Sequence, residues 1–99
     1  MQYKINATAQ FIKWHNKILD KKVLSRLDAR LFRLVNGNFG DAKRIDANLF
    51  ELRCTFGGGL RIYYTVKNNI VILLLNGGNK SSQVKDIFNA RKIIKSIED

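Results

Sequence analysis

The sequence predicts an α+β domain in which a helical hairpin packs on a small, mainly antiparallel sheet of three to four strands, with a helix at the C-terminal end. Apolar residues recur at a spacing near 3.6 before residue 36, and the spacing changes to 2 after Lys43. Glycine and asparagine clusters then separate successive apolar runs, as turns separate strands. The 99 residues contain no repeat or linker, so a single domain over 1–99 is expected.

The N-terminal part predicts a short strand and a helix. Residues 2–5 alternate weakly, and Asn6 and Thr8 both suit the N-cap of a helix that carries Phe11 and Trp14 on one stripe. We therefore expect these two aromatic side chains in the core rather than on a surface that stacks on a ligand.

A second amphipathic helix follows the interruption at Asp20. Its apolar stripe consists of Leu24, Leu27, Leu31, Leu34 and Val35. The stripe stops before Gly37, a residue that suits the left-handed conformation at a helix end. The two segments are expected to form an antiparallel hairpin.

Three sequential antiparallel strands are predicted next. Residues 50–56 and 60–66 alternate between apolar and polar, with glycines at 57–59 between them. Asn68-Asn69 suits a two-residue hairpin turn, and 70–75 is wholly apolar, as a central strand requires. The final helix is expected to bury apolar residues that include Phe88.

The charge balance restricts the function classes. Eighteen Lys and Arg against eight Asp and Glu give +10, which favours nucleic acid, an anionic membrane or an acidic protein as a partner. The longest apolar run, Ile70 to Leu75, is too short to span a bilayer, and no signal-like segment opens the chain, so a cytoplasmic protein is expected. His15 and Cys54 are the only residues of their kinds, so neither a zinc site nor another cofactor is predicted.

Alternation places Arg53, Arg61 and Tyr63 on one side of the predicted sheet. Two guanidinium groups on one face can bind a phosphate and stabilise the charge that develops when a 2′-hydroxyl attacks it. Tyr63 is the better candidate for stacking on a base. The alternative is a solvated strand face, in which Glu51 pairs with Arg53.

The segment Gly77-Gly78-Asn79-Lys80-Ser81-Ser82 offers a second phosphate site, with backbone amides at a helix start beside the Lys80 ammonium. The alternative is an ordinary connection in which Ser81 or Ser82 caps the helix. The spacing of a nucleotide-triphosphatase loop is absent. Lys43 and Arg44 are candidates for steering the RNA backbone toward the site.

Seven motifs occur in order between about residue 11 and residue 91. They are Phe11-x-x-Trp14, Arg30-Leu31-x-Arg33-Leu34, Gly37-Asn38-Phe39-Gly40-Asp41-x-Lys43, Glu51-Leu52-Arg53, Gly58-Gly59-Leu60-Arg61-Ile62-Tyr63-Tyr64, Leu73-Leu74-Leu75-x-Gly77-Gly78-x-Lys80 and Ser82-Gln83-x-x-Asp86-Ile87. In this order they resemble the RelE/ParE toxin superfamily, most closely its HigB-like branch of phage-derived addiction module killer proteins.

This resemblance implies a toxin that is a metal-independent, ribosome-dependent messenger-RNA endoribonuclease and thereby inhibits translation. Arg53, Arg61 and Lys80 match basic active-site positions of RelE-like toxins, and Asp86 matches the position of their general base. Glu51 is a second candidate for proton transfer, although its place beside Arg53 favours a structural role.

The resemblance also implies partners. They are a cognate antitoxin, typically a small helix-turn-helix protein of the HigA type, the ribosome with its mRNA, and operator DNA reached through the antitoxin. Two alternatives stay open. One is a ParE-like inhibitor that binds DNA gyrase without cleaving RNA, and the other is a degenerate toxin that acts only as an antitoxin-binding partner.

Overall fold

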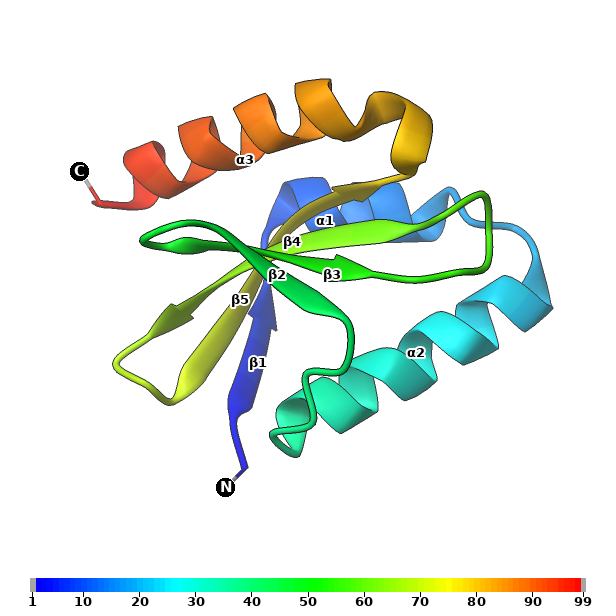
Figure 1. Cartoon of the computed structure of the whole chain (residues 1–99), viewed down its shortest axis with the longest axis horizontal. Coiled ribbons are helices and arrows are strands. Elements are labelled where there is room, and N and C mark those ends of the chain that lie inside the picture. The colour runs from blue at the N-terminus through cyan, green and yellow to red at the C-terminus, as the bar shows by residue number, and fades with distance from the viewer. Residues whose placement is uncertain (1, 99) are drawn as a thin grey trace.

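The computed structural model describes residues 2–98 as a sheet flanked by helices on both faces (Figure 1). In chain order the elements are β1 (Lys4–Ala7), α1 (Ala9–Asn16), α2 (Lys21–Val35), β2 (Ala42–Asp46), β3 (Leu49–Arg53), β4 (Arg61–Lys67), β5 (Val71–Gly78), a 3₁₀ turn (Lys80–Ser82) and α3 (Gln83–Glu98). The predicted α+β class, with its helical hairpin, mainly antiparallel sheet and C-terminal helix, is confirmed.

The sheet has the strand order β1-β5-β4-β3-β2. The pairs from β2 to β5 are antiparallel, and β1 runs parallel to β5. The described residues thus form five strands instead of three to four. The strand missed from the sequence is β2, an edge strand of sequence Ala-Lys-Arg-Ile-Asp in which no residue is fully buried. An edge strand without one apolar face shows no period of 2, so alternation does not reveal it.

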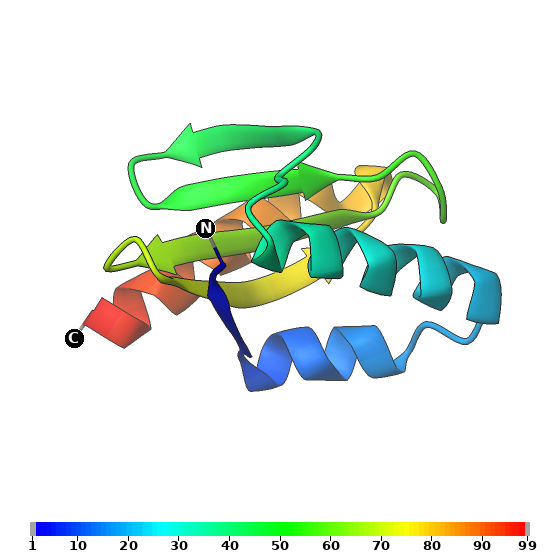
Figure 2. The same cartoon turned by 90° about the horizontal axis from the view of Figure 1, so that it is seen from below.

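Each face of the sheet has its own apolar cluster. The helices α1 and α2 contribute Phe11, Leu27 and Leu34 to the larger cluster, where they meet the β3, β4 and β5 side chains Leu52, Ile62, Tyr64, Ile72 and Leu74. On the other face, Ala90 of α3 packs with Leu49, Tyr63 and Leu75. Figure 2 shows α1 and α2 as a hairpin. His15 Nε2 of α1 lies 3.2 Å from Asp28 Oδ1 of α2, so a side-chain contact joins the two helices.

Local signals set several element boundaries where the sequence predicts them. The Thr8 hydroxyl accepts a hydrogen bond from Phe11 N and caps α1. Gly37 follows the end of α2 with φ +85°, and Asn68 and Asn69 take positive φ in the turn between β4 and β5. The first strand starts at Lys4, two residues later than expected.

Phe88 is a correction to the predicted core. Its side chain is 57% exposed on α3, where the Lys92 ammonium lies 4.8 Å from the ring centroid. The helix packs on the sheet through Ala90 and the adjacent isoleucines instead, so Phe88 lies outside its narrow buried stripe. None of the helices within residues 2–98 is long and apolar enough to cross a membrane.

Candidate functional site

Two arginines lie side by side at one end of the sheet. Arg53 of β3 pairs with Arg61 of β4, and Arg61 pairs with Gly78 of β5. In the next row Glu51 pairs with Tyr63, so these four side chains share the face that α3 covers. The Arg53 side chain is 40% exposed and that of Arg61 is 13% exposed.

Lys80 joins this row from the turn that follows β5. It is exposed, and a Cβ placed on Gly59 would lie 3.4 Å from the Lys80 Cβ. The glycine loop after β3 is therefore next to the lysine. The structure brings Arg53, Arg61 and Lys80 to one edge of the molecule, which we call the basic end.

Glu51 lies beneath the basic end as a fully buried carboxylate. Its Oε2 accepts hydrogen bonds from the Tyr63 hydroxyl at 3.0 Å and from Gln83 Nε2 at 2.7 Å. Its Oε1 lies 3.9 Å from Arg61 Nη1 and has no hydrogen-bond partner among residues 2–98. Glu51 is thus placed to hold Arg61 rather than Arg53.

The proposed role of Tyr63 in stacking on RNA is wrong for this structure. The side chain is fully buried against α3, and its hydroxyl is engaged with Glu51. Burial, followed by the charge and hydrogen bond of Glu51, raises the pKa of Tyr63 well above its ordinary value. Tyr63 is therefore a neutral donor that anchors the carboxylate.

Arg53 has a different partner from the one the sequence suggested. Its Nη2 lies 2.8 Å from the Asp41 carboxylate, and its Nε donates to the same oxygen at 3.2 Å. Both side chains are substantially exposed, so the pair contributes at most about 1 kcal/mol to stability. The guanidinium therefore remains accessible to a phosphate.

The backbone amides predicted to bind phosphate after β5 are already occupied. Asn79 Oδ1 accepts from Ser81 N at 3.0 Å and from Ser82 N at 3.3 Å. The cap is therefore Asn79 rather than either serine, and Gly77 and Gly78 belong to β5 itself. Lys80 keeps its place at the basic end, but the amide site beside it is not formed.

Asp86 lies close to the basic end. Its carboxylate accepts a 2.5 Å hydrogen bond from the Ser82 hydroxyl and covers the Cα of Gly78, where an added Cβ would come within 1.8 Å of Oδ2. Gly78 is therefore required for Asp86 to occupy this position. Asp86 is a partly exposed carboxylate beside the row of cations, in contrast to the buried Glu51.

The structure separates Lys43 from Arg44. Lys43 pairs with Glu51 and shares the face of the basic end, whereas Arg44 pairs with Phe50 and lies on the opposite face. There Arg44 donates to the backbone oxygens of Asp46 and Ala47. Lys43 is exposed on the edge strand and remains a candidate for contacting RNA, while Arg44 does not face the same site.

Sequence reasoning missed two residues of this region, Gln83 and Asp41. Gln83 starts α3 and reaches Glu51 only because the turn after β5 folds the helix over the sheet. Asp41 precedes β2 and meets Arg53 through the pairing of that unpredicted strand. Glu51 falls on the polar phase of its strand in the sequence, so the pattern gives no signal that its carboxylate is buried and needs polar partners.

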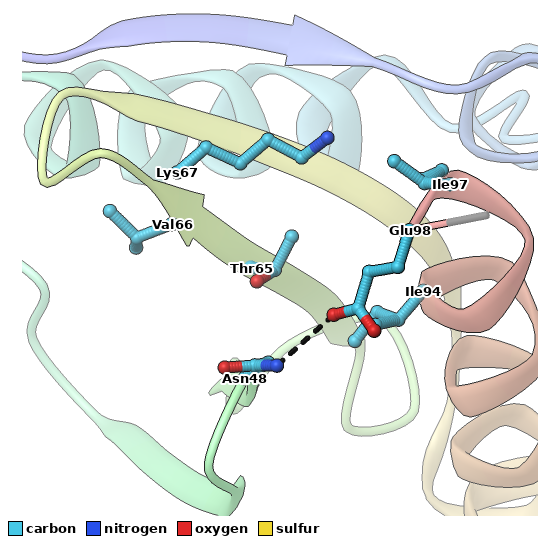
Figure 3. A pocket seen from close by; sticks show the side chains of 7 residues that line it. All are labelled: Asn48, Thr65, Val66, Lys67, Ile94, Ile97 and Glu98. Atoms are coloured by element: carbon cyan, nitrogen blue, oxygen red, sulfur yellow. Dashed lines mark hydrogen bonds between the residues drawn. The ribbon is translucent and has the colours of Figure 1, made fainter.

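A pocket of about 160 Å³ lies at the far end of α3 and is separate from this site (Figure 3). The Glu98 carboxylate there accepts a hydrogen bond from Asn48 at 3.1 Å. Thr65, Val66 and Lys67 of β4 line its other side. These residues occupy the end of β4 opposite Arg61.

The fold is that of known toxins. A mutant of the Escherichia coli toxin RelE in the free state superposes with a TM-score of 0.72 at 19% identity, covering 93% of this chain and 97% of that chain. A RelBE toxin–antitoxin complex from Mycobacterium tuberculosis gives 0.66 at 16% identity, covering 81% and 100%. The intact E. coli RelBE complex gives 0.63 at 16% identity, covering 78% and 95%.

Sequence comparison adds one relative. No protein-family model matches the chain. A protein of Haemophilus influenzae strain Rd, described only as uncharacterized, is 37% identical over 97 residues, which are 98% of each chain. The chain belongs to the same family as this H. influenzae protein, and it has the RelE-like toxin fold.

Proposed function

We propose that this protein is the toxin of a toxin–antitoxin pair and acts as a ribosome-dependent mRNA endoribonuclease. The observation that carries the proposal is the convergence of Arg53, Arg61 and Lys80 at one end of a RelE-like sheet, beside the carboxylate of Asp86. The similar solved structures include a free toxin and toxins bound to their antitoxins.

The chemistry that suits this arrangement is cleavage of a phosphodiester by the adjacent 2′-hydroxyl. Arg61 lies at the centre of the basic end. Its Nε is buried and has no hydrogen-bond partner within residues 2–98, and its Nη1 lies as far as 3.9 Å from Glu51 Oε1. A phosphate would use this donor capacity, and a guanidinium stabilises the negative charge that grows on its oxygens. Arg53 and Lys80 contribute further positive charge from either side.

Asp86 is the better candidate for proton transfer of the two carboxylates. It is partly exposed and engages a hydroxyl, whereas Glu51 is fully buried and already accepts from two donors. A general base must reach the proton that it removes. We therefore assign Asp86 to acid–base chemistry and Glu51 to positioning Arg61.

Such a site relies on an oriented substrate, because positioning alone supplies several kcal/mol of barrier reduction. This is the reason to expect cleavage of mRNA held by the ribosome in the cytoplasm. An antitoxin of the helix-turn-helix type would cover the toxin and carry the complex to operator DNA. The HigB-like assignment predicts that kind of antitoxin, and pull-down with the product of the neighbouring gene tests it.

The test is induction of the protein without its neighbour gene, followed by in vitro cleavage of mRNA on purified ribosomes. We expect growth arrest that the neighbour gene reverses, and cleavage only with ribosomes present. Arg61→Ala should lower the cleavage rate at least ~100-fold, the usual scale for losing a transition-state donor. Arg61→Lys should restore part of it, since an ammonium lacks the planar fork of donors.

Arg33, which is exposed on α2, provides the matched control, and Arg33→Ala should cleave like the wild type. Wild-type cleavage by Arg61→Ala would remove Arg61 from the site. Intact transcripts with inhibited DNA supercoiling would favour the gyrase inhibitor. Normal growth with abundant folded protein that still binds the antitoxin would identify a degenerate toxin.

A further inference from the structure

A second pocket, of about 380 Å³, lies between α1 and α3 and is not part of the basic end. It adjoins the edge of β5, because the pairing of β1 with β5 stops at Leu74 and leaves the last residues of β5 without a neighbouring strand on that side. Its polar and aromatic lining consists of Gln10, Trp14, Asn76, Asp86, Asn89 and Lys92.

Asn76 is the deepest polar residue of this lining, with only 8% of its surface exposed. Its Nδ2 donates to the backbone oxygen of Asp86 at 2.9 Å, which fixes the orientation of the amide. Its Oδ1 is buried and has no hydrogen-bond partner within residues 2–98. A buried acceptor without a donor destabilises the folded protein, so a ligand N–H that donated to it would be stabilised in return.

Trp14 packs partly against the larger apolar cluster, as the sequence predicts, and also lines this pocket, which the sequence does not predict. The indole ring packs on the backbone of Gly77, where an added Cβ would lie 2.5 Å from ring carbons, so only glycine admits this contact. Gln10 and Asn89 add two more side-chain amides, each able to donate and to accept. An aromatic face beside several amides is the arrangement with which proteins bind an unstacked nucleobase.

The pocket adjoins the basic end through shared residues. Asp86 lines the pocket and also covers Gly78, and Gly78 is the cross-strand partner of Arg61. Lys92 adds a cation on the pocket side. An RNA strand with a phosphate at Arg61 therefore has a place for a neighbouring base on the other side of the last residues of β5.

We propose that this pocket binds one nucleobase of the RNA, by stacking on Trp14 and by hydrogen bonds to Asn76, Asn89 and Gln10. This inference rests on the proposed function and deepens it, because a base held here would select the position at which the strand is cut. Asn76, Asn89 and Gln10 are positioning and specificity residues, and the cations of the basic end together with Asp86 perform the chemistry.

Trp14 is the only tryptophan of the chain, so its fluorescence reports on this pocket alone. The first experiment titrates the intact protein with adenosine 5′-monophosphate and, separately, with ribose 5-phosphate. We expect saturable quenching by the nucleotide and none by the sugar phosphate. Equal responses to both would show phosphate binding only, and no response to either would also overturn the proposal.

Two pocket variants and one control complete the binding test. Asn89→Ala and Gln10→Ala remove amides from helix positions that are not buried, and each should weaken nucleotide binding about tenfold. Gln2→Ala removes an exposed amide outside the pocket and should bind like the wild type. Unchanged affinity in both pocket variants would place the bound nucleotide elsewhere.

The second experiment maps the 5′ ends of transcripts that are cut after induction. Wild-type cuts should show a base preference next to the cleaved bond, and Asn89→Ala should lower that enrichment at least about threefold, the smaller share expected for one of several contacts. The same cut-site pattern in both proteins would overturn the proposal. If the wild type cuts no RNA, the proposed function fails, and the fluorescence titration still decides whether the pocket binds a base.

Discussion

Glu51 illustrates how one residue links the core of this protein to its surface. Its Oε2 is held by Tyr63 and Gln83, while Oε1 faces Arg61 across 3.9 Å. A buried carboxylate is costly unless it is paired and hydrogen-bonded, so this one fixes three side chains around it. Glu51 therefore holds the guanidinium of Arg61 in one orientation, in which it can bind a phosphate.

Replacing Glu51 by glutamine should separate this positioning from folding. The amide oxygen can still accept from Tyr63 and Gln83, but an NH₂ group then faces Arg61 and no longer attracts it. We expect Glu51→Gln to lower ribosome-dependent cleavage by about tenfold to a hundredfold, the cost of a small misplacement in a site. Thermal unfolding of the same preparation should stay close to the wild type.

The matched control is Asp41→Asn, which removes the exposed carboxylate beside Arg53 and should change cleavage much less. Glu51→Ala provides a second comparison, because it leaves the Tyr63 hydroxyl and Gln83 amide without their acceptor and should destabilise the fold. Wild-type cleavage by Glu51→Gln would show that Arg61 does not need the Glu51 carboxylate to hold it in position.

At the scale of elements, the turn between β5 and α3 decides where Lys80 and Gln83 lie. Asn79 caps this turn through its side chain. In return, the Ser82 hydroxyl accepts a hydrogen bond from the backbone N of Asn79 at 3.3 Å. The same serine hydroxyl donates to Asp86. A cap placed here fixes the start of α3 on the sheet and thereby positions Gln83, which donates to Glu51.

Asn79→Ala should remove that cap at a cost of about 1 kcal/mol, which corresponds to a fall in the melting temperature of roughly 4–8 °C for a domain of this size. Cleavage should fall as well, because Lys80 and Asp86 flank the released turn. Asn48→Ala, which removes only an exposed bond to Glu98, should have a smaller effect on both measurements. Equal effects in the two variants would argue against a special role for the turn.

The elements differ in how far the sequence predicts them. The strands β3, β4 and β5 bury apolar side chains in a regular pattern, so alternation identifies them. The edge strand β2 presents only one partly buried apolar residue to each cluster, Ala42 and Ile45, and therefore shows no alternation. Phe88 matches a helical stripe by spacing, yet α3 buries a narrower face. Periodicity indicates which residues share a face, but the width of the contact depends on the neighbouring element.

The candidate site shows the same division. Alternation correctly places Arg53 and Arg61 on one face, because two paired strands suffice for that inference. The partners of these residues, Asp41 and Gln83, come from segments whose positions depend on strand register and on the direction of α3. Burial separates Tyr63 from its predicted contact with RNA, and a single strand pattern does not show that a helix covers it.

For the whole molecule, the net charge of +10 attracts RNA from any direction, but only part of that charge lies at the basic end. Several cations have partners outside the basic end, as Arg91 has in Asp46 and Arg44 has in the backbone oxygens of Asp46 and Ala47. The charges of the basic end must therefore be distinguished from the general field by their dependence on salt.

We expect affinity for a short single-stranded RNA to fall linearly with salt on logarithmic axes, with a slope of roughly 0.7 for each phosphate that is neutralised. If Lys80 contacts a phosphate directly, Lys80→Ala should reduce that slope by about 0.7, because one fewer counterion is released. Lys95→Ala, at the far end of α3, is the matched control with the same loss of charge and should leave the slope nearly unchanged. Equal slopes for the two variants would mean that RNA affinity depends on total charge alone. The basic end would then not be the site that binds the RNA backbone.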